Sequence, residues 1–247
     1  MKKRIAVLLL LCALPLLPAF TAAGRGREDA AELSALPDSP DWVAALGEKQ
    51  EAEQLFVIAG VEKSTAWISL HEKDADGEWK TLMTTPGYIG IRGLGKKREG
   101  DRKTPTGVFR FNAAFGAAHD PGCAIAYHKL TEDDYWSGDA REGYGYNQMV
   151  SIRELPDLDV GASEHLIDIL PRYEYCLNIS YNEDCVPGLG SAIFLHCLAA
   201  DKPYTAGCVA IPRDDMLTVM QHVRPDCVVV IDYLKTLSPE TWASWGM

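Results

Sequence analysis

The sequence is short of positive charge. Its 247 residues include 24 lysines and arginines against 35 aspartates and glutamates, a formal net charge of −11 at pH 7. Binding to nucleic-acid phosphates needs a basic face, so this balance argues against a nucleic-acid partner. An acidic protein can still bind peptides that carry free amines.

Metal-binding and nucleotide-binding patterns are also missing. The seven cysteines and six histidines form neither a C-x-x-C pair nor the paired spacing of a zinc site. A glycine-rich basic stretch over 95–104 superficially resembles a phosphate loop. However, Asp101 and Arg102 separate its second glycine from the Lys-Thr pair, which follows directly in a true phosphate loop. We therefore expect no metal, no cofactor and no nucleotide.

Only the start of the chain is long and apolar enough to suggest a membrane segment. Lys2, Lys3 and Arg4 precede an apolar run over 5–17, and small residues follow it. This is the pattern of a secretory signal, and it is too short to span a membrane comfortably. We predict a signal peptide over 1–23 and an exported protein, with an uncleaved anchor as the alternative. We expect no other membrane contact.

The remaining chain is expected to form one domain that is mainly β. A lead-in and short helix over 24–54 precede a domain over 55–235, and a tail follows over 236–247. Short apolar strands alternate with glycine and proline turns, as in a β-sandwich or open barrel. Helices are predicted over 163–170 and after Pro212. The predicted strands span 55–59, 65–71, 79–85, 88–92, 108–111, 124–128, 148–152, 175–180, 192–196, 208–211 and 228–233.

The stretch 193–211 carries the candidate chemistry. His196 ends an apolar strand-like run, and Gly207 precedes Cys208 at the head of another. A cysteine attacks as its thiolate, which a nearby base favours, and the amides of Gly207 and Cys208 could hold a developing oxyanion. His196 and Cys197 point to opposite faces of a strand, so only one can face such a site. The alternative is a buried core cysteine beside an unrelated histidine.

These residues are part of a longer pattern that resembles the L,D-transpeptidase catalytic domain of the YkuD type. The cysteine motif reads TAGCV over 205–209, and its upstream partner reads FLH, ending at His196. Further matching blocks are EGDRKTPTGVFRF (99–111), DDYWSG (133–138), YN (146–147), SYN (180–182) and PGLGSAIFLH (187–196). The resemblance covers about residues 55–235. It implies a β-sandwich of mixed sheets, with Cys208 at the mouth of a cleft and His196 facing it.

The resemblance also implies an enzyme of the bacterial cell envelope or extracellular space that acts on peptidoglycan stem peptides. Cys208, activated by His196 and assisted by the Gly207 amide, would attack the bond between the L-centre of a diamino acid and D-alanine. An amine of a second stem would then take the thioester and form an L,D-crosslink. Water as acceptor would make the protein an L,D-carboxypeptidase or endopeptidase. A non-catalytic wall-binding module is the remaining alternative.

Four residues are candidates for substrate binding around this cleft. The carboxylate of Asp134 could bind a substrate ammonium, and the ring of Trp136 could cover its alkyl stem. The alternative is a capped loop with Trp136 half-buried. Tyr181 and Asn182 end a predicted strand and could frame the cleft.

The sequence departs from the family pattern after the cysteine, and this places the chain in a divergent branch. Members of the superfamily often carry an arginine two residues beyond the cysteine, where this chain has Ala210. The nearest arginine that could take over its role is Arg213. The distance from His196 to Cys208 along the chain is also shorter than in many members.

The remaining cysteines have structural interpretations. Export permits disulfides, and Cys176 and Cys185 are the first pair we would expect to bridge. Cys123, Cys197 and Cys227 look like small apolar core residues. Cys208 must stay reduced to act, and we expect it to react rapidly with a thiol reagent at neutral pH.

Overall fold

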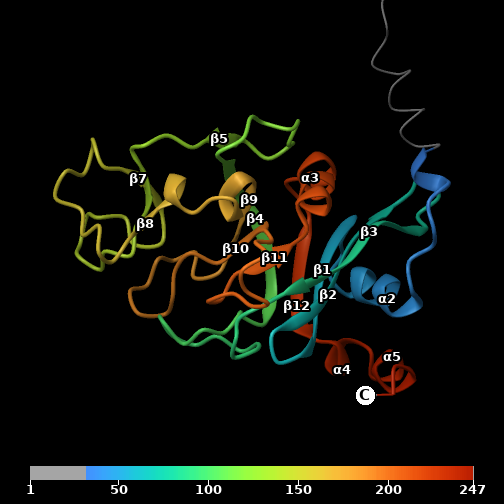
Figure 1. Cartoon of the computed structure of the whole chain (residues 1–247). Helices are drawn as coiled ribbons and strands as arrows, with labels where there is room; N and C mark the ends of the chain where they lie inside the picture. The colour runs from blue at the N-terminus through green and yellow to red at the C-terminus, as the bar shows by residue number, and fades with distance from the viewer. Residues whose placement is uncertain (1–31, 247) are drawn as a thin grey trace, which may run out of the picture.

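The computed structural model describes residues 32–246. The predicted signal peptide over 1–23 and the first part of the lead-in lie outside the described residues. Within them, one nine-stranded sheet has the order β12-β1-β2-β3-β11-β10-β9-β4-β5, and β4 also pairs with β12. The sheet therefore closes on itself as a barrel-like core (Figure 1). Its strands are β1 (Gln54–Glu62), β2 (Thr65–Lys73), β3 (Trp79–Tyr88), β4 (Gly107–Gly116), β5 (Tyr127–Lys129), β9 (Cys176–Ile179), β10 (Phe194–Cys197), β11 (Val209–Ile211) and β12 (Val228–Tyr233).

The sheet is mixed, and the protein is mainly β as the sequence predicts. Strands β1 and β12, β10 and β11, and β4 and β5 pair in parallel, and the remaining neighbours are antiparallel. The predicted helices at the start of the domain and after Pro212 are confirmed as α2 (Asp41–Lys49) and α3 (Arg213–His222). Two further short helices follow: α4 (Leu234–Leu237), which crosses the predicted boundary between domain and tail, and α5 (Pro239–Ser244), which lies in the predicted tail.

The helix predicted over 163–170 is wrong. The segment instead forms β8 (Glu164–His165) and a single 3₁₀ turn, η1 (Leu166–Asp168), before Pro171. Glu164 and His165 pair with strand residues Trp136 and Tyr135, and Pro171 disfavours helical geometry at Leu170, so too few residues remain between them for the predicted helix. Strand β8 joins β6 (Asp134–Trp136) and β7 (Met149–Ser151) in a small sheet of order β7-β6-β8.

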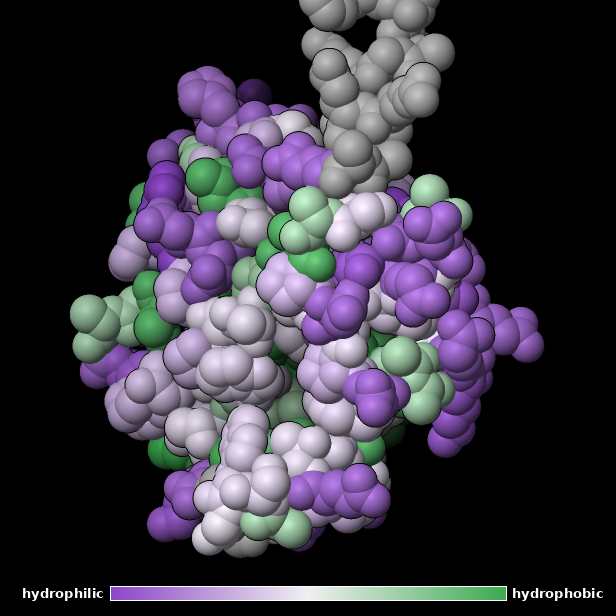
Figure 2. Space-filling view, turned by 90° about the vertical axis from the view of Figure 1, so that its right-hand side faces the viewer, coloured by the Kyte–Doolittle hydropathy of each residue, from purple (hydrophilic) through white to green (hydrophobic). Residues whose placement is uncertain are grey.

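Strand periodicity accounts for how the barrel is filled. In β1, Phe56 and Ile58 belong to the main core, whereas Leu55, Val57 and Ala59 belong to a second cluster with α2. Successive strand residues point to opposite faces, so a continuous apolar strand is buried on both sides only if something covers its outer face. Helix α2 covers that face. Figure 2 shows this side of the molecule, where hydrophilic residues dominate and hydrophobic residues form small separate patches.

The small sheet stands at the opposite side of the barrel from α2 (Figure 1). It meets the barrel through a third apolar cluster: Phe115, Leu130, Trp136, Leu166, Tyr173, Cys176 and Phe194, with Cys208 packed against it. None of the described helices is long and apolar enough to cross a membrane. Between residues 32 and 246, no group of three or more potential metal ligands comes together.

Candidate active site

The parallel pair β10 and β11 brings His196 and Cys208 to one side of the sheet. His196 is the register partner of Ala210, two residues after Cys208. Leu195 and Cys197 point into the barrel core, so His196 points the other way. His196, Cys208 and Ala210 all line one cavity of about 370 Å³, called here the His196 cavity. The structure therefore places His196 at the site and Cys197 behind it.

The tautomer of His196 follows from its hydrogen bond. The Nδ1 atom lies 2.8 Å from the carbonyl oxygen of Cys197. A carbonyl only accepts, so Nδ1 carries the proton and Nε2 keeps its lone pair. The imidazole is 5% exposed, and burial lowers its pKa to about 4. His196 is therefore a neutral base with a fixed orientation near pH 7.

Cys208 rests as a thiol. Its Sγ donates to the carbonyl oxygen of Ala192 at 3.2 Å and accepts from the Phe194 amide at 3.5 Å. Burial, followed by the nearby charge of Glu164, raises the pKa of Cys208 to about 12. The expectation of a thiolate that labels rapidly at neutral pH is therefore contradicted, because the neutral His196 supplies no positive charge to stabilise it.

The loop before β11 is held by two threonine hydroxyls. Thr205 Oγ1 accepts from the Gly207 amide at 3.1 Å and donates to the Cys208 carbonyl at 2.6 Å. Thr104 Oγ1, fully buried, donates to the Gly207 carbonyl at 2.7 Å. The Gly207 amide is thus committed to Thr205, which argues against its predicted role in the oxyanion hole. The Cys208 amide remains as the candidate for that role.

The role of Gly207 is steric. Its φ of +156° is rarely adopted by L side chains. A Cβ there would lie 3.1 Å from the Lys103 carbonyl oxygen and 3.2 Å from Ile193 Cδ1. Glycine therefore lets the cysteine loop pass close to the 103–104 segment.

A second cavity of about 540 Å³ opens on the other side of the thiol. It is called here the Trp136 cavity. The side chain of Trp136 is buried, stacks on Phe115, and donates from Nε1 to Asn147 Oδ1 at 3.1 Å. Four residues line both cavities: Arg102, Glu164, Ala206 and Cys208. Cys208 therefore lies between the two cavities and lines both.

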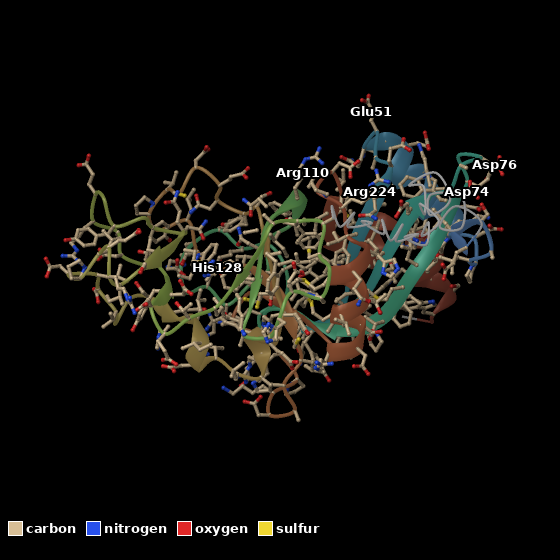
Figure 3. The ribbon with its side chains drawn as sticks, turned by 90° about the horizontal axis from the view of Figure 1, so that it is seen from above. Glu51, Asp74, Asp76, Arg110, His128 and Arg224 are labelled. Carbon is tan, nitrogen blue, oxygen red and sulfur yellow. The ribbon has the colours of Figure 1, made fainter. Side chains whose placement is uncertain are left out.

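The structure does not place Asp134 in either cavity. Its Oδ2 accepts from the Thr131 amide at 2.6 Å, the Thr131 hydroxyl at 2.9 Å and His128 Nε2 at 2.9 Å. His128 is labelled in Figure 3, on the side of the molecule that carries the small sheet. These hydrogen bonds hold the Asp134 carboxylate against residues close to it in the chain. The structure therefore agrees with the alternative interpretation of this segment as a capped loop.

Three further candidates also lie outside the lining of both cavities. Tyr181 donates from its hydroxyl to the Leu189 carbonyl at 2.8 Å. Asn182 donates to the Gly190 carbonyl at 2.8 Å and so shapes the loop before β10. Arg213, on α3, pairs with Glu174 at 2.6 Å. Arg213 is therefore engaged elsewhere and does not replace the missing arginine at the cavity.

Sequence reasoning missed the charged residues that do line the cavities. Arg172 and Lys202 line the His196 cavity, and Arg102 and Glu164 line both cavities. Arg172 pairs with Asp201 at 2.6 Å, whereas Arg102 forms no ion pair within the described part of the chain. In the sequence, Arg102 was only one member of a charged loop and had no feature that marked it as a site residue. Glu164 was assigned to a helix that does not form.

The predicted disulfide is absent. Cys176 is a buried free thiol and Cys185 is a partly exposed one. Cys185 lies near the Glu183 carbonyl and the Gln148 side chain, and Cys176 packs in the aromatic cluster beside the site. Cys197 and Cys227 are buried in the main core as predicted, and Cys123 packs against it partly buried.

Comparison with known proteins gives one family. The family model for the YkuD L,D-transpeptidase catalytic domain matches residues 63–231. The chain is also similar to the solved structure of the Ldtfm–avibactam carbamoyl enzyme, at 13% identity and a TM-score of 0.35. That match covers 73% of this chain and 49% of the other, so this chain spans about half of that protein's length. No curated protein matches the chain.

Proposed function

Because the chain belongs to the L,D-transpeptidase catalytic domain family, we propose that it is an exported cysteine acyltransferase that joins peptidoglycan stem peptides by L,D-crosslinks. The observation that carries this proposal is the shared cavity of Cys208 and His196, with His196 Nδ1 fixed by the Cys197 carbonyl. That hydrogen bond leaves Nε2 as the acceptor that acyl transfer needs.

The acylation step follows from two neutral partners. His196 Nε2 takes the Sγ proton as the sulfur of Cys208 attacks the amide carbonyl. The Cys208 amide stabilises the oxyanion. His196 then gives the proton to the leaving nitrogen, the C–N bond breaks, and a thioester remains on Cys208. Every proton in this step is carried by His196.

The two cavities suit a donor and a leaving group. The leaving amine must receive its proton from His196, so it belongs in the His196 cavity. The acyl part of the donor then occupies the Trp136 cavity, where the indole can cover an alkyl stem. Arg102 lines the His196 cavity without an ion-pair partner within residues 32–246, and it suits the carboxylate of a departing D-alanine.

A second site beside the thioester favours transfer to an amine over simple hydrolysis. The incoming amine binds in the cavity that the leaving amine has vacated. It then attacks the thioester from the side on which the leaving amine departed. Water would need no such cavity. L,D-carboxypeptidase or endopeptidase activity is therefore the second candidate, and it would use the same Cys208 thioester.

The test is mass spectrometry of disaccharide-tetrapeptides incubated with the exported form of the protein. We expect a crosslinked product that has lost one D-alanine, and none with Cys208→Ala. Cys197→Ala, which changes a thiol on the opposite face of β10, is the matched control and should retain activity. Trimmed monomers alone would support the hydrolase. No change in the peptide, with no acyl adduct on Cys208, would support a wall-binding module.

A further inference from the structure

Glu164 is a carboxylate at the reaction centre with no role in the acylation step. It lines both cavities together with Cys208. Its Oε2 accepts from the Tyr173 hydroxyl at 2.6 Å, and Tyr173 is itself 4% exposed. Strand β8 places Glu164 as the register partner of Trp136. Burial is the main cause of the raised pKa of the Cys208 thiol, and the nearby charge of Glu164 raises it further.

Half of this carboxylate is available to a ligand. Oε1 makes no side-chain hydrogen bond within the described residues, whereas Oε2 is held by Tyr173. No fully buried side-chain oxygen or nitrogen in residues 32–246 lacks a partner, so Oε1 must be reachable from a cavity. No lysine, arginine or histidine described here forms an ion pair with Glu164. Burial raises the pKa of Glu164, as expected for a carboxylate without a cation.

The proton balance of transfer to an amine shows what is missing from the His196–Cys208 pair. An alkyl amine arrives as an ammonium with three N–H bonds, and the new amide keeps one. Two protons must therefore leave the nitrogen. One returns to Sγ through His196 when the C–S bond breaks. The other must be lost before attack, because an ammonium has no lone pair.

Hydrolysis has no such requirement. Water attacks with a lone pair and loses one proton to His196, which returns it to Sγ. His196 alone completes that balance. A second proton acceptor at the thioester is therefore specific to aminolysis.

We propose that Glu164 binds the ammonium of the acceptor stem through Oε1 and takes its first proton, with Tyr173 as the positioning residue that holds Oε2. Proton transfer converts an ammonium–carboxylate pair into two neutral groups, which a partly desolvated cavity favours. The neutral amine then attacks the thioester, gives its second proton to His196, and leaves Cys208 as a thiol. The acceptor class is a primary alkyl amine.

The role of Glu164 rests on the proposed acyl transfer, so the experiment separates the two. The purified protein is acylated with a tetrapeptide donor, and the acyl group is offered to an alkyl-amine acceptor, to hydroxylamine, or to water alone. Hydroxylamine is largely neutral at pH 7 and needs no prior deprotonation. Products and the Cys208 adduct are quantified by mass spectrometry.

For Glu164→Gln, we expect the ratio of alkyl-amine transfer to hydrolysis to fall roughly 100-fold, the usual scale of general-base catalysis. Acylation of Cys208, hydrolysis and transfer to hydroxylamine should stay within a few-fold of wild type. Tyr173→Phe keeps the carboxylate and should lower the ratio less. Glu174→Gln changes a carboxylate that pairs with Arg213 and lines neither cavity, and it should leave the ratio unchanged.

Two results would overturn the role of Glu164 while the acyltransferase proposal stands. The ratio could be unchanged in Glu164→Gln. Transfer to hydroxylamine could fall as far as transfer to the alkyl amine, which would indicate a structural effect. A wild type that forms the acyl-enzyme and transfers it only to water would overturn both the role of Glu164 and the crosslinking activity, and would support the hydrolase. Failure of the wild type to form any adduct on Cys208 would instead refute the proposed function.

Discussion

Alkylation of Cys208 as a function of pH tests whether the thiol and imidazole rest as a neutral pair. The pKa of this thiol lies near 12, against an ordinary 9.0. At pH 7 about one molecule in 10⁵ is then a thiolate, against about one in 100 for an ordinary cysteine, so iodoacetamide should react roughly a thousand times more slowly. The rate should rise about tenfold per pH unit from 6 to 9.

The variant His196→Ala tests whether the imidazole affects the ionisation of the thiol. A neutral imidazole does not stabilise a thiolate, so its removal should change the alkylation rate by less than about threefold while abolishing acyl transfer. Peptide mapping separates Cys208 from the partly exposed Cys123 and Cys185, which serve as internal controls. A rate that is flat between pH 5 and 8, and that collapses in His196→Ala, would instead reveal a preformed thiolate–imidazolium pair.

Three further outcomes are expected. Arg102→Ala should raise KM for a donor ending in D-alanine about tenfold with little change in kcat, whereas Arg213→Ala should leave KM unchanged, as steady-state kinetics would show. Gly207→Ala should lower activity at least tenfold and cost about 1–3 kcal/mol in urea unfolding, because its Cβ crowds Lys103; wild-type activity would refute the steric role. Burial lowers the pKa of His71 from 6.5 to about 4. The unfolded chain therefore binds the proton first, and about 3 kcal/mol of stability present above pH 6.5 is lost toward pH 4. His71→Gln should reduce that loss between pH 7 and 4.5, and an unchanged slope would contradict it.

The fold class was predictable because it depends on local pattern, and the candidate pair was predictable because the chain resembles the family motif. Apolar runs between glycine and proline turns identify strands such as β1 and β12, whose two faces are both buried. Period-two alternation puts His196 and Cys197 on opposite faces, and the resemblance assigns the cleft to His196. The closure of β4 onto β12 was not predictable, because it pairs segments more than a hundred residues apart.

Substrate-side residues were harder because their roles depend on which partners the fold supplies. Asp134 and Glu164 are both acidic residues at the first position of a short strand in the small sheet. Asp134 finds three donors on Thr131 and His128, whereas Glu164 finds only Tyr173 among the described residues and lines both cavities. Similarly, the Gly207 amide could serve an oxyanion until Thr205 Oγ1 takes it. Hydrogen-bond competition of this kind leaves no trace in residue spacing.

A resting neutral pair also explains why a carboxylate can be tolerated beside the nucleophile. If Cys208 had to be a thiolate at rest, Glu164 would oppose its ionisation and slow the enzyme. When the Sγ proton moves to His196 during attack, negative charge is on the sulfur only transiently and passes to the carbonyl oxygen. The nearby carboxylate therefore raises the activation free energy less than it would beside a resting thiolate. The same carboxylate then stands beside the thioester when an ammonium arrives. The placement of Glu164 on β8 thus adds to the effect of burial on the thiol pKa and also supplies a second proton acceptor at the thioester.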